Sequence, residues 1–132
     1  MREVTVRWAG GRFAQDIEIG GHRLRADEEQ DKGGEDSGPG PHELLLAALG
    51  SCTAMTLKVY AERKGWPLTN VEVDVNGSTT AAGFVITTLL TLKGELDAEQ
   101  RQRLIEIAEK CPVHKTLSNT ITIQTTAALA PF

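Results

Sequence analysis

Two cysteines, Cys52 and Cys111, are the residues best able to carry chemistry in this chain of 132 residues. In a reducing compartment, a cysteine pair indicates catalysis, redox sensing or metal binding more often than a structural disulfide. The alternative is that both are small buried hydrophobic residues, since free cysteine is among the most buried residue types. Reactivity requires a thiolate, which burial disfavours, so an enzyme would need a cation near the nucleophile.

Cys52 lies within a predicted helix over residues 41–64. Proline suits the first position of a helix, as Pro41 does here, and Gly65 follows as a typical C-terminal residue. The first half of the segment is apolar nearly all round, which is typical of a buried helix. One sheet of so small a chain cannot cover such a helix on every side, so we expect a second subunit to supply part of its cover.

Cys111 ends a second predicted helix, which has Asp97 as its N-cap and Gln100 at the capping-box position. Pro112 is expected to stop this helix. Cys111 shares one face, at helical spacing, with three apolar residues: Leu104, Ile107 and Ala108. The negative end of a helix disfavours a thiolate on Cys111, whereas Cys52 in mid-helix feels little of either end. We therefore expect Cys52 to be the nucleophile, if an arginine reaches it, and Cys111 to be the resolving thiol.

Alternating apolar residues predict the strands of a single α+β domain over residues 1–132, in the order β-β-β-α-β-β-α-β. Each strand is expected to bury one face. Gly10-Gly11 and Gly20-Gly21 mark two hairpin turns. The strands are predicted around these residues: Val4 to Trp8, Phe13 to Ile19, His22 to Ala26, Val71 to Val75, Phe84 to Leu92 and Ile121 to Thr125.

The segment over residues 27–41 is acidic and rich in glycine and proline. It has too little apolar surface to order itself, so we expect either a solvated linker or a mobile loop beside a site.

Composition excludes several function classes. The formal net charge is −4, and without a basic run we expect no nucleic-acid partner. No apolar stretch approaches the roughly 20 residues that cross a bilayer, and residues 1–4 lack the apolar region of a signal peptide. We therefore expect a cytoplasmic protein with no membrane partner. His42 and His114 do not give the two cysteines the close ligand pairing of a structural zinc site, so no metal or cofactor is expected.

Two motifs resemble the OsmC/Ohr family, named after osmotically inducible protein C and organic hydroperoxide resistance protein. The run from Gly38 to Cys52, GPGPHELLLAALGSC, resembles the family's first-cysteine helix. The run from Lys110 to Leu117, KCPVHKTL, resembles its second-cysteine motif. The cysteine spacing and strand order also fit, so the similarity covers essentially the whole chain, as a divergent OsmC-like branch. It implies an intertwined homodimer with a site at the subunit interface.

The resemblance also implies a reaction, the thiol-dependent reduction of organic hydroperoxides. Cys52 would attack the peroxide and become a sulfenic acid, and Cys111 would condense with it to a disulfide. A dithiol reductant would then restore both thiols. We expect an apolar pocket for alkyl peroxides to include Leu45, Leu49 and Met55. The alternative function is a non-enzymatic redox sensor or apolar-ligand-binding protein on the same fold.

The family's activating arginine lies in an early strand or turn, where Arg12 is the best match and Arg23 and Arg25 are substitutes. The alternative is that Arg12 is an exposed turn residue.

The family's glutamate lies ten residues before the first cysteine, where this chain has His42, with Glu43 next to it. This departure implies weaker peroxidase activity or a different substrate. Glu43 could instead simply favour the positive end of its helix. Ten residues of helix span about 15 Å, so Glu43 would serve the Cys52 site of the partner chain rather than its own.

Overall fold

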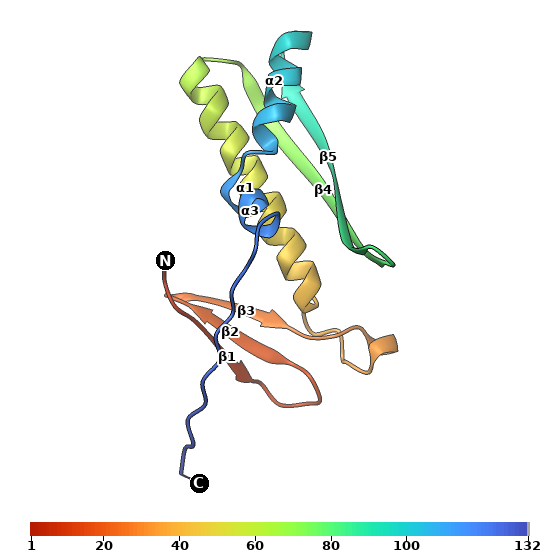
Figure 1. Cartoon of the computed structure of the whole chain (residues 1–132), viewed down its shortest axis with the longest axis vertical. Helices are drawn as coiled ribbons and strands as arrows, with labels where there is room; N and C mark the ends of the chain where they lie inside the picture. The colour runs from red at the N-terminus through yellow and green to blue at the C-terminus, as the bar shows by residue number, and fades with distance from the viewer. Residues whose placement is uncertain (132) are drawn as a thin grey trace. The chain divides into compact units, whose positions relative to one another are not determined.

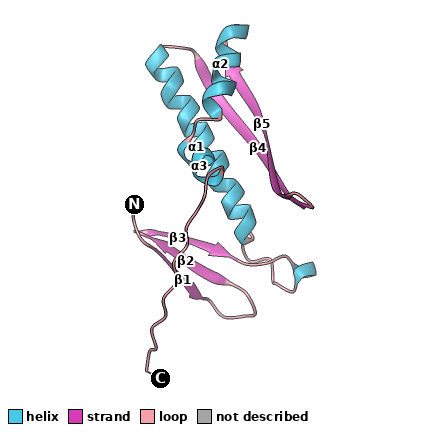
Figure 2. Ribbon diagram, viewed as in Figure 1, coloured by secondary structure: helices cyan, strands magenta, loops and turns pink. Residues whose placement is uncertain are grey.

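The structure, a computed structural model, describes residues 1–131 with five strands, three α-helices and a short 3-10 helix (Figures 1 and 2). In chain order the elements are β1 Val4–Trp8, β2 Gln15–Ile19, β3 His22–Ala26, η1 Gln30–Lys32, α1 Pro41–Lys64, β4 Leu68–Thr80, β5 Gly83–Gly94, α2 Ala98–Ala108 and α3 Pro112–Leu117. Strands β1, β2 and β3 form one sheet and β4 and β5 another. The predicted α+β class is confirmed.

The chain divides into two compact units. Unit 1 comprises residues 1–48 and 75–87, and unit 2 comprises residues 49–74 and 88–131.

Unit 1 contains the predicted antiparallel meander. Ile17 of β2 pairs with Val6 on one side and with Leu24 on the other. Gly10 (φ 92°) and Gly20 (φ 58°) take the left-handed backbone that the two turns need. The prediction that each strand buries one face is wrong for β1. Its three apolar residues are exposed in the single chain: Val4, Val6 and Trp8.

Unit 1 also contains the acidic segment, which is ordered by hydrogen bonds around Asp27. The buried Asp27 carboxylate accepts the Glu28 N–H (2.8 Å), the Ser37 N–H (3.0 Å) and the Ser37 hydroxyl (2.7 Å). The Asp27 N–H donates to the Pro39 carbonyl at 3.0 Å. The bonds that its carboxylate accepts, led by that of the Ser37 hydroxyl, lower the pKa of Asp27 to about 2. The expectation that the segment cannot order itself was wrong. Hydrogen bonds to one buried carboxylate hold this segment in place although it buries little apolar surface.

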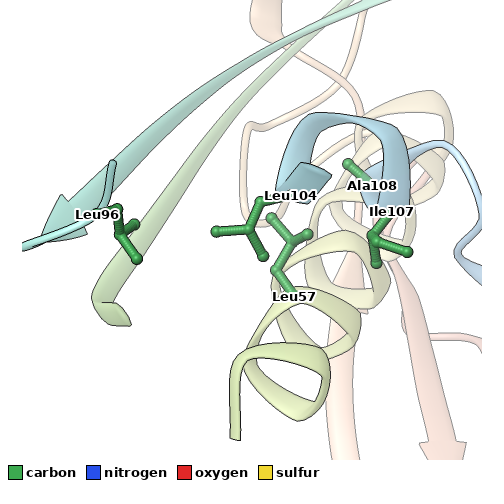
Figure 3. Packing of buried hydrophobic residues seen from close by; sticks show 5 residues of the cluster. All are labelled: Leu57, Leu96, Leu104, Ile107 and Ala108. Atoms are coloured by element: carbon green, nitrogen blue, oxygen red, sulfur yellow. The ribbon is translucent and has the colours of Figure 1, made fainter. Parts of the chain in front are cut away.

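Unit 2 holds a hydrophobic core built from α1, α2 and the strand ends. Its buried members are Leu57, Leu96, Leu104, Ile107 and Ala108. Figure 3 shows Leu57 of α1 and Leu104 of α2 pointing toward one another, and both are completely buried. The predicted capping box of α2 is confirmed, because the Asp97 and Gln100 side chains accept each other's backbone N–H.

Helix α1 buries one narrow stripe rather than its whole circumference. The stripe repeats every four residues: Leu49, Thr53, Leu57 and Ala61. The side chain of Met55 is 68% exposed. By length and composition α1 could cross a membrane, contrary to the sequence expectation, although core helices of other proteins share these properties. Of its most apolar 18-residue stretch, 22% is buried, and the apolar residues Leu45, Met55 and Val59 are exposed in the single chain.

The C-terminal part differs from the prediction in two places. Helix α2 ends at Ala108, and Pro112 begins α3 instead of stopping α2, because proline lacks the N–H that the first helical position leaves unpaired. The strand predicted at Ile121 and Ile123 is not formed, since residues 120–131 pair with no other strand among the described residues. Ile123 is 83% exposed.

Replacing Leu57 by alanine tests the core of unit 2. We expect Leu57→Ala to lower the free energy of unfolding by about 2–5 kcal/mol, because it leaves a cavity in a fully buried site. Urea unfolding measures the change. The control is Leu89→Ala, whose leucine is 64% exposed and should cost about 0.5 kcal/mol or less. Equal losses in the two variants would show that the core lies elsewhere.

Acid titration tests the hydrogen bonds around Asp27. Its pKa falls from 3.8 to about 2 on folding, so its stabilising effect is complete above about pH 4 and is lost as the pH falls toward 2. We expect Asp27→Asn to be less stable than the wild type at neutral pH and to lose less further stability between about pH 5 and pH 2. Urea midpoints across this range measure both. Asp31→Asn, an exposed carboxylate in η1, is the control and should keep the wild-type slope; the same slope in Asp27→Asn would contradict the assignment.

Candidate active site

Cys111 lies in unit 2, in the short connection between α2 and α3, and is fully buried. It is the N-cap of α3, and its Sγ accepts the backbone N–H of His114 at 3.3 Å. Its carbonyl accepts the Lys115 N–H at 3.1 Å. The expectation that Cys111 occupies the negative end of a helix was therefore wrong, because Pro112 starts a new helix after it. The negative end of a helix is therefore no longer a reason to prefer Cys52 over Cys111 as the nucleophile.

A second polar contact reaches the Cys111 sulfur from α1. The hydroxyl oxygen of Thr53 lies 3.6 Å from Cys111 Sγ, and either atom can donate. Thr53 is only 3% exposed. The sequence reasoning missed this residue, although a signal was present: Thr53 is the one polar member of the buried stripe of α1, and a buried hydroxyl needs a partner.

Cys52 is half-buried on α1, one residue before Thr53. Both cysteines are free thiols, and both belong to unit 2. Since consecutive Cα atoms are about 3.8 Å apart, the 3.6 Å contact of Thr53 places Cys111 Sγ within about 10 Å of the Cys52 Cα atom. This upper bound is compatible with the expected approach of the two thiols.

A cavity of about 540 Å³ opens in unit 2 beside these residues. Apolar and polar residues both line it, and its polar members are Thr53, Thr88, Arg101, Glu109 and His114. Thr53 and His114 also contact Cys111 Sγ, so the cavity adjoins the buried thiol. Of the three residues expected around an apolar pocket, Leu49 lines this cavity. Met55 lines a separate cavity of about 220 Å³, and Leu45 is an exposed residue of unit 1.

Arg12 lies in the exposed turn between β1 and β2, in unit 1. Its guanidinium carbon is 4.7 Å from the centre of the Phe13 ring, a cation–π contact. Of the substitutes, Arg25 forms an ion pair with Asp16 at 2.9 Å, and Arg23 is an exposed residue of β3. The role of Arg12 beside Cys52 stays a prediction.

Glu43 lies in the first turn of α1, also in unit 1. Its carboxylate accepts the Gly40 N–H at 2.8 Å, as expected of a residue that satisfies the free donors of a helix start. The neighbouring His42 ring packs on Phe84, with the ring centres 5.2 Å apart. Helix α1 is continuous over Pro41–Lys64. The expectation that Glu43 serves the Cys52 site of a partner chain required such an unbroken helix. Its catalytic role stays a prediction.

The described residues 1–131 contain no group of three or more histidine, cysteine or acidic side chains placed to hold a metal ion. Cys52 and Cys111 are free thiols, and they supply thiol chemistry to the candidate site. One is half-buried on a long helix, and the other is buried and hydrogen-bonded beside a cavity.

Solved structures with the same fold include proteins of several bacteria. The OsmC-like protein of Mycoplasma pneumoniae is 18% identical, with a TM-score of 0.77 over 89% of this chain and 87% of that one. An organic hydroperoxide resistance protein of Legionella pneumophila is 23% identical, with a TM-score of 0.64 over 87% and 88%. The organic hydroperoxide resistance protein OhrB of Bacillus subtilis is 26% identical, with a TM-score of 0.61 over 88% and 89%.

No functionally curated protein matches the chain. The sequence model of the OsmC-like proteins matches residues 34–126, a range that includes Glu43, Cys52 and Cys111. Because this match covers most of the chain, the protein belongs to the OsmC-like family.

Proposed function

We propose that this protein is a thiol-dependent peroxidase that reduces organic hydroperoxides, with hydrogen peroxide as a second candidate substrate. The observation that carries the proposal is the 3.6 Å contact between the Thr53 hydroxyl and Cys111 Sγ. Thr53 directly follows Cys52, so this contact brings the buried thiol close to the backbone of the other cysteine. Membership of the OsmC-like family and the likeness to hydroperoxide resistance proteins support the same reaction.

The proposed cycle uses each cysteine once. The Cys52 thiolate attacks the distal peroxide oxygen, the O–O bond breaks, and the alkoxide takes a proton and leaves as an alcohol. Cys52 is then a sulfenic acid, which condenses with the Cys111 thiolate to a disulfide and releases hydroxide, protonated to water. A dithiol reductant restores both thiols by exchange.

Arg12 is proposed to keep Cys52 anionic, with Glu43 of the partner subunit orienting that guanidinium. Both side chains have alternative contacts in the single chain, Arg12 with Phe13 and Glu43 with the Gly40 N–H. Each side chain would give up its present contact when it joins the Cys52 site.

We also propose a cytoplasmic homodimer that binds neither nucleic acid nor membrane. The net charge of −4 opposes nucleic-acid binding. Apolar side chains left open in the single chain support a second subunit as their cover. They include Val6, Trp8, Met55, Val59, Leu89 and Ile105.

Peroxide consumption with a dithiol reductant tests the activity. We expect Cys52→Ser to lower the turnover of an alkyl hydroperoxide by on the order of 100-fold or more, because the nucleophile is lost. Cys111→Ser should still react once and leave a sulfenic acid on Cys52 that a dimedone probe traps. Wild-type turnover in Cys52→Ser would refute the proposal. Slow stoichiometric oxidation of the wild type, without turnover, would favour the redox sensor or ligand-binding protein instead.

Light scattering tests the homodimer. We expect a mass of about twice the 14.3 kDa chain. Met55→Glu places a charge on an open apolar position of α1 and should shift the protein toward the monomer. Lys58→Gln, at an exposed polar position one turn away, is the control and should remain dimeric. A stable wild-type monomer with full activity would contradict the second subunit.

A further inference from the structure

We propose that Thr53 is a positioning residue for Cys111, whose hydroxyl prepares the buried sulfur for disulfide formation. The inference rests on the proposed function, because it concerns the second chemical step of that cycle. The thiol expected to resolve the sulfenic acid is completely buried, so protein groups have to take the place of water around the sulfur that must attack.

Two hydrogen-bonding groups face the buried sulfur. The His114 N–H can only donate, and it lies 3.3 Å from Cys111 Sγ. The Thr53 hydroxyl lies 3.6 Å away and can act in either direction. It can accept the S–H of the resting thiol and, by rotating, donate to the thiolate. Thr53 can therefore form a hydrogen bond with the Cys111 sulfur both before and after deprotonation, as acceptor and then as donor. The backbone N–H of His114 can act only as a donor.

The backbone around Cys111 restricts where this sulfur can lie. The Cys111 N–H donates to the Ala108 carbonyl at 3.4 Å, and its carbonyl accepts the Lys115 N–H at 3.1 Å. Thr53 is held in turn within the buried stripe of α1. Because Thr53 follows Cys52, the contact places the resolving thiol beside the backbone segment that carries the sulfenic acid.

The Cys111 thiol loses its proton, and its sulfur attacks the sulfur of the Cys52 sulfenic acid. An S–S bond forms while the S–O bond breaks, so both sulfur atoms end at the disulfide level. The leaving hydroxide takes a proton and departs as water. The Thr53 hydroxyl stabilises the attacking thiolate and is not consumed.

Packing alone does not require a hydroxyl at this position. Its stripe neighbours Leu49, Leu57 and Ala61 are apolar, and valine has nearly the shape of threonine. Thr53→Val therefore removes the contact to Cys111 while filling the same space, and Thr53→Ser keeps the hydroxyl while losing the methyl group.

A single-turnover experiment on the full chain tests the role. Reduced protein is mixed with one equivalent of tert-butyl hydroperoxide and quenched with acid, and mass spectrometry follows the thiol, sulfenic acid and disulfide forms. We expect Thr53→Val to form the sulfenic acid at the wild-type rate but to convert it to the disulfide about tenfold or more slowly, as for the loss of one hydrogen bond to a charged group. Thr53→Ser should return this rate to near the wild-type value.

The outcomes separate this inference from the proposed function. Disulfide formation at the wild-type rate in Thr53→Val, or a Thr53→Ser variant as slow as Thr53→Val, overturns the role of Thr53 and leaves the peroxidase intact. No sulfenic acid on Cys52 in the wild type overturns the proposed function and the step with it. If urea unfolding shows that Thr53→Val is not folded, Thr53→Ala replaces it, and the comparison with Thr53→Ser decides in the same way.

Discussion

The site depends on the way a buried sulfur is held between two polar groups. Cys111 has no exposed surface, yet its Sγ lies within hydrogen-bonding distance of the Thr53 hydroxyl and the His114 N–H. A buried cysteine surrounded only by hydrocarbon would be inert. Here one group comes from the long helix α1 and the other from the first turn of α3, so the sulfur marks the point where two segments distant in sequence meet.

The hydrophobic core of unit 2 helps to fix the position of Cys111 beside Thr53. Leu57, one turn after Thr53, packs with Leu104 of α2, and both are fully buried. Helix α2 then ends at Ala108, so Cys111 follows directly from an element anchored in the core. Apolar burial provides the stability, and the Thr53–Cys111 contact adds the chemical specificity. The open apolar residues Met55 and Val59 of α1 lie outside this core, which is consistent with a second subunit.

Much of the fold could be predicted from the sequence, because its signals are local. The meander follows from period-two alternation with glycine turns, and the start of α2 follows from the reciprocal cap of Asp97 and Gln100. The errors arise where structure depends on less local effects. Pro112 both discourages the preceding helix and favours a new one, and the second effect makes Cys111 the N-cap of α3 rather than the last residue of α2. The acidic segment is ordered by Asp27, one buried carboxylate that composition does not reveal.

The candidate site was predictable to the level of its sulfur atoms but not of their partners. Cys52 and Cys111 follow from residue type and motif. The four-residue spacing of the α1 stripe marks Thr53 as a buried polar residue but does not show that its partner is Cys111. Arg12 and Glu43 illustrate the reverse case. Their residue types suit the chemistry, but in the single chain each has a contact of its own.

Peptide mapping after oxidation tests the central claim most directly. The full-length protein is treated with one equivalent of hydroperoxide, free thiols are alkylated, and the digest is analysed without reductant. We expect a single cross-link joining the peptides of Cys52 and Cys111 within one chain. Two peptides that remain separate after the peroxide has been consumed, or a cross-link that joins Cys111 to its copy in another chain, would contradict it.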